Sequence, residues 1–490
     1  MQKVESTLEN KLKQKEIVTH SSSTVFWGFA NKNFDTRISF LNHFLLKREI
    51  PSVSMRLSLR TMNGELLLEV IENINQPKVY SYSLVQLLEQ TNLSEGEFAI
   101  YIEFTSAKNL AVPFCAVTSE IISQTTLDLV HTYGRALECD EFGSRIDFKT
   151  SYEIGWGIWN FGPKFQNYCI FHNGRLHSNT SFELSIFKNG NFIKNLQHIN
   201  KEFNPFSTLR ICLEDVLIEQ EEYTLFEEIS SSDPGSFDIK IKISNINSTF
   251  PRLLFISSKH LDNNNPVGIN NIDKINITHS NFDFDKAEQP PSKNNYGFIV
   301  NPKYPIGIKS GFRYYPCKDL EKIKIQNQHD NTLPFEINDD SFLKVDSKNS
   351  IPSRLVGSNW SIWNTKNFFK DCSTGTFINE YQINSGFWHW GRLQPKGQNI
   401  NSIISIINPF AEDNSIHHFL VKIYNESGEI FKNEITFTGK AYYIDFRDNS
   451  DLLNNNGGWY TVTGEGIGRF NVFSTCFFNN LEDGTIEHAF

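Results

Sequence analysis

The chain has 490 residues, of which 39% are hydrophobic and 21% charged, so its composition is neither that of a disordered chain nor that of a membrane protein. Acidic residues exceed basic ones by 56 to 46, which gives a net charge of −10, and no basic block is present. A dedicated nucleic-acid-binding protein is therefore not expected, because phosphate contacts need clustered Lys and Arg.

The first 20 residues, MQKVESTLENKLKQKEIVTH, are charged throughout and predict an N-terminal arm without a secretory signal. No apolar run approaches the roughly 18–20 residues of a membrane-spanning helix. The 7 cysteines lie far apart and form no CxxC pair, so neither a disulfide framework nor a structural zinc site is expected. Free thiols are typical of a reducing compartment, and we expect a cytoplasmic location.

Three segments of the chain repeat the same order of features. Each opens with a strand that carries a tryptophan, at Trp27, Trp159 and Trp390. An apolar strand ending in asparagine follows 14 to 18 residues later, at Asn42, Asn173 and Asn408. We predict that the three tryptophans are buried in their own modules; where one is a core residue, replacement by Ala would cost about 3–5 kcal/mol.

The remaining features of each copy are a tight turn, two further strands and a histidine. The turns fall at Asn63-Gly64, Asn189-Gly190 and Ser427-Gly428, and Asn-Gly is a strong hairpin signal because type I′ turns need positive φ. A glycine-led strand comes next, followed by a strand that closes in hydroxyls, at Ser119, Ser258 and Thr475. Each copy ends with a histidine, at His131, His279 and His488. Their recurrence in one order predicts homologous modules.

About seven strands in roughly 110 residues, separated by turns, are typical of an antiparallel β-sandwich. We therefore predict an all-β protein of tandem β-sandwich modules, with three clear copies and one degenerate copy. The predicted divisions are an arm at 1–20 and sandwiches at 21–135, 136–285 and 371–490, with 286–370 forming either the degenerate copy or a connector. Within that interval, Asn301 resembles the asparagine that ends the apolar strand of the other copies.

The repeated histidines allow two interpretations. Three imidazoles brought together by the packing of the modules could bind one metal ion, as open catalytic zinc sites often use three His ligands. Alternatively, each histidine makes a hydrogen bond inside its own module, because duplication copies structural residues together with the fold. We favour the second interpretation and expect no metal and no cofactor; the alternative metal site is formed by His131, His279 and His488.

Clustered aromatic residues form the other candidate site. Exposed flat rings flanked by Asn and Asp can hold sugars, because the C–H faces of a sugar pack on aromatic rings. The aromatics that vary between copies are expected to be exposed, and the predicted ligand-binding residues are Trp360, Trp363, Tyr314, Tyr315 and Trp388.

The standard catalytic signatures are missing from the sequence: there is no GxSxG elbow, no Walker A loop and no HExxH motif. The sequence therefore favours a non-catalytic binding or scaffold protein, with a polysaccharide, a glycoconjugate or a protein surface as partner. The alternative is an enzyme, either a sugar-active one or a metal-dependent one that uses the repeated histidines. The sequence carries no indication of an oligomeric state.

Overall fold

The computed structural model describes residues 20–108, 110, 115–131, 152–162, 164–175, 177–188, 191–219, 221–222, 224–225, 227, 235–244, 252–260, 272–279, 281–282, 296–314, 323–325, 335–336, 342–347, 357–363, 369–372, 377–379, 387–394, 399–447, 458–465 and 470–490. The predicted arm therefore lies outside the described residues, except for His20 at its end. The chain divides into two compact units, one formed by Glu5–Phe187 and Phe192–Ser280 and the other mainly by Asn281–Phe490.

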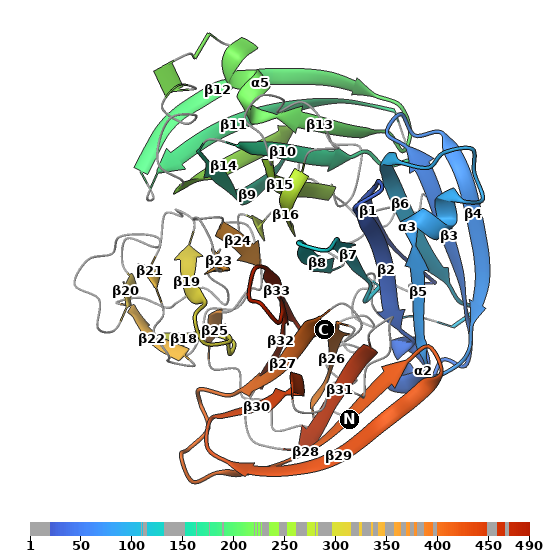
Figure 1. Cartoon of the computed structure of the whole chain (residues 1–490), viewed down its shortest axis with the longest axis vertical. Coiled ribbons are helices and arrows are strands. Elements are labelled where there is room, and N and C mark those ends of the chain that lie inside the picture. The colour runs from blue at the N-terminus through green and yellow to red at the C-terminus, as the bar shows by residue number, and fades with distance from the viewer. Residues whose placement is uncertain are drawn as a thin grey trace, which may run out of the picture. The chain divides into compact units, whose positions relative to one another are not determined.

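The first unit holds two sandwiches (Figure 1). The elements of the first sandwich are β1 (Ser21–Ala30), β2 (Asp35–Leu41), α2 (His43–Arg48), β3 (Val53–Thr61), β4 (Leu66–Ile74), β5 (Val79–Ser83), α3 (Leu84–Leu88), β6 (Gly96–Thr105), β7 (Thr118–Ile122) and β8 (Leu127–His131). The elements of the second are β9 (Tyr152–Phe161), β10 (Phe165–His172), β11 (Ser178–Lys188), β12 (Asn191–Phe203), β13 (Thr208–Cys212), α5 (Leu213–Glu219), β14 (Gly235–Ser244), β15 (Arg252–His260) and β16 (Ile272–His279).

The second unit holds two more sandwiches. It begins with the short strand β17 (Asn281–Phe282), and its third sandwich contains β18 (Tyr296–Val300), β19 (Lys309–Tyr314), β20 (Ile323–Ile325), β21 (Phe335–Glu336), β22 (Phe342–Ser347), β23 (Gly357–Ile362), β24 (Phe369–Cys372) and β25 (Phe377–Asn379). The fourth contains β26 (Phe387–Leu393), β27 (Ile400–Ile407), β28 (Ile416–Asn425), β29 (Gly428–Thr438), β30 (Ala441–Asp445), β31 (Gly458–Glu465), β32 (Asn471–Phe478) and β33 (Gly484–His488).

The sandwiches share one strand order. In the first, the sheets run β1-β6-β3-β4 and β5-β2-β7-β8; in the fourth, β26-β31-β28-β29 and β30-β27-β32-β33 follow the same order. The second repeats it with β9-β14-β11-β12 and β13-β10-β15-β16. The third repeats it with β18-β22-β20 and β21-β19-β23-β24, and β25 joins the free side of β18. The prediction of an all-β protein of tandem β-sandwiches with one degenerate copy is thus confirmed.

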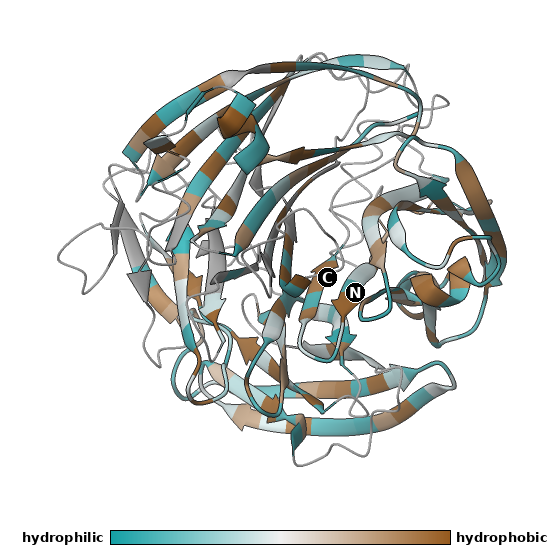
Figure 2. Cartoon of the chain, turned by 45° about the horizontal axis from the view of Figure 1, so that its top comes forward, coloured by the Kyte–Doolittle hydropathy of each residue, from teal (hydrophilic) through white to brown (hydrophobic). Residues whose placement is uncertain are grey.

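Alternation along the strands explains why each pair of sheets closes into a sandwich, since successive side chains point to opposite faces. Figure 2 shows hydrophobic and hydrophilic residues alternating along many of the strands. In the second sandwich the core includes Phe171 on one sheet and Phe182 on the other, whose ring centroids lie 5.3 Å apart. In the first, Phe40 on β2 meets Phe104 on β6 edge to face at 5.0 Å.

The repeated asparagines have a common structural role. Each follows the second strand of its sandwich, and its backbone N–H donates to a carbonyl that lies before the fifth strand: Lys78 for Asn42, Ser207 for Asn173 and Lys440 for Asn408. The side chains then satisfy nearby backbone groups, as where Asn42 accepts from the N–H of Leu45 and caps the short helix α2. A buried chain reversal needs these bonds, because unpaired backbone groups are costly there.

The predicted turns are confirmed where they are described. Gly64 and Gly428 have φ values of 93° and 122°, the left-handed region that favours glycine. Gly190 lies outside the described residues. Gly64 is also packed tightly, because a Cβ there would lie 2.4 Å from the carbonyl oxygen of Pro205 in the second sandwich.

The three tryptophans are all buried, at 5% exposure for Trp27 and Trp159 and 6% for Trp390, but only Trp159 lies in a sandwich core. Trp27 lies on the outer face of β1, next to Val25, Ala99 and Tyr101 in the strand pairing. Trp390 likewise lies on an outer face. Its neighbour Gly391 faces the core residue Tyr460, and successive residues of a strand point to opposite faces. The prediction that all three are buried is confirmed, and Trp390 packs on Phe490 of its own sandwich, with ring centroids 5.6 Å apart. A position in the sandwich core holds only for Trp159, because the other two lie on outer sheet faces that further chain covers.

The third sandwich corrects one detail of the predicted repeat. Asn301 follows β18, which matches the first strand of the other sandwiches in its pairing and not the second. The resemblance of Asn301 to Asn408 was therefore misleading, because an apolar strand followed by asparagine is a short pattern. The predicted domain boundaries stay predictions; the strands of the four sandwiches span 21–131, 152–279, 296–379 and 387–488.

Candidate binding pocket

A pocket with a cavity volume of about 140 Å³ lies between the first two sandwiches, inside one compact unit. It is bounded by the outer face of the first sheet of one sandwich and the outer face of the second sheet of the next. The lining residues are Trp27, Phe29, Glu97, Gln166, Tyr168, Arg210, Cys212, Asp215, Ile256, Ser258, Ile272 and Ile275. Aromatic, charged and apolar side chains therefore share one enclosed space.

The wall contributed by the first sandwich consists of Trp27, Phe29 and Glu97. Trp27 and Phe29 are two residues apart on β1 and so share a face. Their rings are stacked, with centroids 5.7 Å apart and an interplanar angle of 12°. The indole N–H of Trp27 donates to the Glu97 carboxylate at 3.1 Å, which fixes the ring edge-on to the acid.

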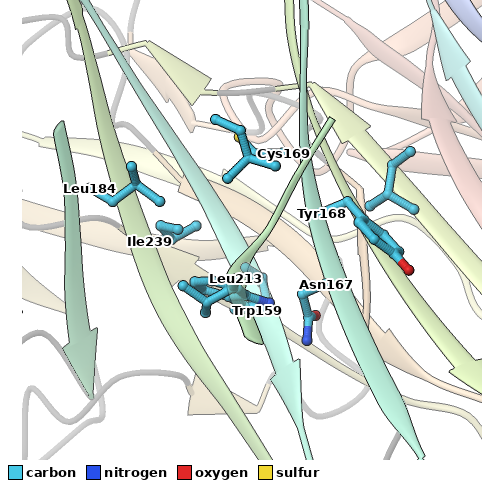
Figure 3. Close-up of a pocket in the computed structure, with 10 residues that line it drawn as sticks. Trp159, Asn167, Tyr168, Cys169, Leu184, Leu213 and Ile239 are labelled. Carbon is cyan, nitrogen blue, oxygen red and sulfur yellow. The ribbon is translucent and has the colours of Figure 1, made fainter. Parts of the chain in front are cut away.

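The wall contributed by the second sandwich comes from neighbouring strands in register. Tyr168 on β10 is paired with Ile256 on β15, and Ser258 is paired with Ile275 on β16. The Arg210 guanidinium from β13 lies 4.9 Å from the centroid of the Tyr168 ring. Figure 3 shows Tyr168 pointing away from Leu184 and Ile239, as expected for a residue that alternates with core-facing Cys169.

An ion pair between Arg210 and Glu97 joins the two walls. The side chain of Glu97 is 9% exposed and that of Arg210 is 38% exposed, so the pair has a buried end and an open end. Burial raises the pKa of Glu97, and the charge of Arg210 together with the Trp27 N–H partly offsets the rise. Arg210 and the Trp27 N–H thus both donate to the Glu97 carboxylate. Glu97 therefore connects the two pocket walls and is not available as a free acid.

Gln166 supplies an unused polar atom to the pocket. The residue is only 8% exposed, and its side-chain oxygen has no hydrogen-bond partner among the described residues. The amide nitrogen makes one weak contact, to the Cys212 sulfur at 3.7 Å. A buried polar atom without a partner costs free energy, so a ligand that supplies the missing hydrogen bond would gain from it.

Behind the pocket, Glu214 accepts from the backbone N–H of Asn167 at 3.2 Å and from its side-chain amide at 2.8 Å. The Cys212 thiol lies 3.3 Å from the same carboxylate. Burial and, next, the charge of Glu214 raise the pKa of Cys212. The thiol therefore stays protonated at neutral pH and is not an activated nucleophile.

Further contacts between the first two sandwiches hold the pocket walls in place. The Tyr101 hydroxyl donates to the carbonyl of Asn173 at 3.0 Å, and the Thr208 N–H donates to the carbonyl of Met62 at 2.8 Å. The Arg60 guanidinium lies 4.0 Å from the centroid of the Phe206 ring. These contacts join the two sandwiches at several points around the pocket.

A second, smaller cavity lies inside the second sandwich (Figure 3). Its volume is about 10 Å³, and Trp159, Asn167, Cys169 and Leu184 are among the residues that line it. A cavity of this size holds at most about one water molecule. It is therefore a packing defect of the core and not a ligand site.

Of the five aromatic residues predicted to bind a ligand, the structure describes the side chains of Trp363 and Trp388. Trp363 is only 3% exposed and packs with Tyr304 and Phe477, so the expectation that it is exposed is wrong. Its indole N–H donates to the Ser361 hydroxyl at 2.7 Å. Trp388 is half-buried on β26, 4.9 Å from Trp390 between ring centroids. The side chains of Trp360 and Tyr314, and the whole of Tyr315, lie outside the described residues.

The repeated histidines occupy equivalent positions. Each is the last residue of the last strand of its sandwich, at His131 in β8, His279 in β16 and His488 in β33. His131 is buried, and Nδ1 of half-buried His488 lies 3.5 Å from the carboxylate of its neighbour Glu487. The His279 side chain lies outside the described residues. The shared metal site stays an alternative prediction.

Sequence reasoning missed the pocket residues Glu97, Tyr168 and Arg210. One signal was available, because the second part of β1 reads VFWGFA and is apolar on both faces. A strand that is apolar on both faces is buried on both, so a second layer must cover its outer face. What lies in that layer comes from residues more than 100 positions away, and no local pattern identifies it.

Comparisons with known proteins add no family. No protein-family model and no curated protein matches the chain. Solved structures with some likeness include a β-glucuronidase from glycoside hydrolase family 2, at 8% identity and a TM-score of 0.12, covering 53% of this chain and 24% of that one. Others are the pilus backbone of Streptococcus pneumoniae, at 8% identity and 0.14, covering 70% and 89%, and a glycosyl hydrolase family 2 member from Bacteroides cellulosilyticus, at 6% and 0.13, covering 94% and 91%.

These TM-scores are too low to carry an argument, and the chain spans about a quarter of the length of the β-glucuronidase. The class of the protein, a tandem array of antiparallel β-sandwiches, follows from its own strand pairing. Among the described helices, none has the length and apolar character needed to cross a membrane.

Proposed function

We propose that the protein is a non-catalytic binding protein whose pocket between the first two sandwiches takes a glycan. The observation that carries this proposal is the combination, in one enclosed pocket, of aromatic rings with the buried, unpartnered side-chain oxygen of Gln166. Binding sites for small ligands are concave, with apolar and aromatic walls and a few placed polar groups. The pocket matches that description.

A sugar suits these walls better than a purely apolar ligand. The C–H faces of a sugar ring pack on aromatic rings such as Tyr168, while its hydroxyls need hydrogen-bond partners. Gln166 and the Glu97–Arg210 pair offer such partners at the edges of the same space. The polar groups would fix the orientation of the sugar, and the rings would supply the contact area.

The chemistry of the pocket favours binding over catalysis. Glu97 is held by Arg210 and Trp27, and the raised pKa of Cys212 keeps its thiol protonated. A sugar-active enzyme is the alternative, since glycoside hydrolysis needs two carboxyls across a cleft and Asp215 also lines the pocket. The free thiols of Cys115, Cys169, Cys212 and Cys476 support a cytoplasmic location as part of the proposal.

The test is a glycan array with the full chain, followed by titration calorimetry on the best glycan with wild type and Tyr168→Ala. We expect one class of glycan to bind without being cleaved, and Tyr168→Ala to weaken binding about tenfold or more. Trp388→Ala, which removes a half-buried ring on the fourth sandwich, serves as the comparison and should bind normally. If Trp388→Ala loses binding and Tyr168→Ala does not, the pocket assignment is wrong. Cleavage of the bound glycan would establish the enzyme alternative.

A further inference from the structure

We infer that the pocket binds the single, uncharged sugar unit at one end of a glycan chain, and that Gln166 selects it; this inference rests on the proposed function. Three observations support it, concerning the size of the cavity, the position of its opening and the balance of its charges.

The size of the cavity limits the ligand. Pockets that enclose a drug-sized ligand have volumes of roughly 300–1,000 Å³. The cavity between the first two sandwiches has about 140 Å³, well below that range. It therefore accommodates one sugar ring and not two consecutive ones.

The residues that line the pocket differ in their exposure to solvent. Phe29, Ser258 and Ile275 are 0–1% exposed and Ile256 is 3% exposed, so these four lining residues are shielded from solvent. Arg210 and Asp215 are exposed and lie at the mouth. We infer that a glycan chain leaves the pocket past these exposed side chains, an arrangement that suits a terminal unit better than an internal one with neighbours on both sides.

The charges in the pocket disfavour an acidic sugar. The positive charge of Arg210 is already paired with Glu97. Asp215 adds a negative charge at the mouth. Among the described residues that line the pocket, no further cation would receive the carboxylate of a uronic acid or sialic acid unit, and burying an unpaired charge is costly. A neutral unit avoids that cost.

Gln166 is the specificity-determining residue of this arrangement. Its unpartnered side-chain oxygen is buried in the pocket, whereas the Ser258 hydroxyl is already bonded to the carbonyl of Gln166 at 3.2 Å. A sugar that presents a hydroxyl or amide donor to the Gln166 side chain satisfies it. A sugar without a donor at that position leaves the amide unpaired, and such sites discriminate strongly.

The experiment uses the full wild-type chain and hexasaccharides of glucose, of N-acetylglucosamine and of galacturonic acid. Each is tested with free ends, with the non-reducing end methylated and with the reducing end converted to the alditol. We expect a neutral hexasaccharide to bind, the galacturonate to bind at least tenfold more weakly, and blocking of one end to remove binding.

If a hexasaccharide binds equally well with either end blocked, or if the galacturonate binds best, the inference is overturned and the proposed function stands. If no glycan binds in any form, the proposed function itself fails. Gln166→Met should lower the affinity of the neutral hexasaccharide about tenfold, whereas Gln86→Met on the exposed side of α3 should leave it unchanged. Equal affinities of the two variants would contradict the role of Gln166. Melting curves show whether both variants fold.

Discussion

The two sandwich–sandwich contacts, one inside each compact unit, use corresponding surfaces in different ways. In both, an earlier sandwich covers the outer face of the second sheet of the next one. Between the first two sandwiches that face carries Tyr168, Ser258 and Arg210 and leaves a pocket. Between the third and fourth it carries Ile403, Phe477 and Tyr443, which join an apolar cluster.

These residues correspond by register. Tyr168 and Ile403 each lie five positions before the repeated asparagine, at Asn173 and Asn408. Their antiparallel partners on the next strand are Ile256 and Thr475. The same strand arrangement thus forms a polar contact with a pocket, the hollow contact, between the first two sandwiches and an apolar, fully packed contact, the filled contact, between the third and fourth. The side chains on one outer face, not the strand order, decide which contact can receive a ligand.

The filled contact also contains a buried ion pair. Lys370 and Asp483 are 3.1 Å apart, and their side chains are 0% and 2% exposed. In the hollow contact, Arg210 keeps 38% of its side chain exposed. A fully buried pair is costly to break, whereas a partly exposed pair contributes little. This difference sets the expected sizes of the following substitutions.

Asp483→Ala should have the largest effect. It removes the carboxylate that pairs with the buried Lys370 ammonium, which should lower the free energy of unfolding by about 3–5 kcal/mol. Urea unfolding of the full chain measures this. The double variant Lys370→Met with Asp483→Leu should recover most of the loss, because it removes both charges. A single variant as stable as wild type would show that the pair is not buried.

Gly64→Ala should come next. Its φ of 93° strains any other residue, and the new Cβ would lie 2.4 Å from the carbonyl oxygen of Pro205. We expect a loss of about 1–3 kcal/mol from the clash, in addition to the strain. Gly439→Ala is the matched control, since its φ is 107° but the Cβ would lie 3.9 Å from the nearest atom, the carbonyl oxygen of Asp413. Equal melting temperatures for the two variants would contradict a tight contact at Gly64.

Arg210→Ala should cost little stability, about 0–1 kcal/mol, because the ion pair is partly exposed. It should nevertheless change ligand binding, because it uncovers the Tyr168 ring and leaves Glu97 with the Trp27 N–H as its remaining donor. Urea unfolding and glycan titration on the same sample separate the two effects. A large loss of stability would mean that the hollow contact depends on this pair as strongly as the filled contact depends on Lys370.

The smallest expected effect is a pH dependence. Because burial raises the pKa of Glu97, the folded chain binds this proton more tightly than the unfolded chain. The contribution of Glu97 to the free energy of unfolding therefore falls as the pH rises from the ordinary value of 4.5 through the raised one. In Glu97→Gln this decline should be absent, and in Arg210→Ala it should extend to higher pH. Urea unfolding between pH 4.5 and 7 tests this, and identical profiles for wild type and Glu97→Gln would refute it.

Local features were predictable because their causes are local. Asn42 and Gly64 could be assigned to a strand end and a turn from a few neighbouring residues, since capping and positive φ involve only adjacent backbone. The core position of Trp159 followed the same logic. The same reasoning failed for Trp27 and Trp363. Alternation shows that a strand face is apolar, but it does not show whether the core or another sandwich covers that face.

The sequence by itself determined the all-β class and the tandem sandwiches. Period-two alternation, turns and the repeated order of features along the chain all depend on residues that are close in sequence. Only the tertiary structure decided where a ligand could enter. The pocket joins Trp27 and Glu97 of the first sandwich to Tyr168 and Arg210 of the second, residues separated by up to 183 positions. Their meeting depends on how two outer sheet faces pack, and packing between distant faces depends on side-chain shape and charge that no local pattern encodes.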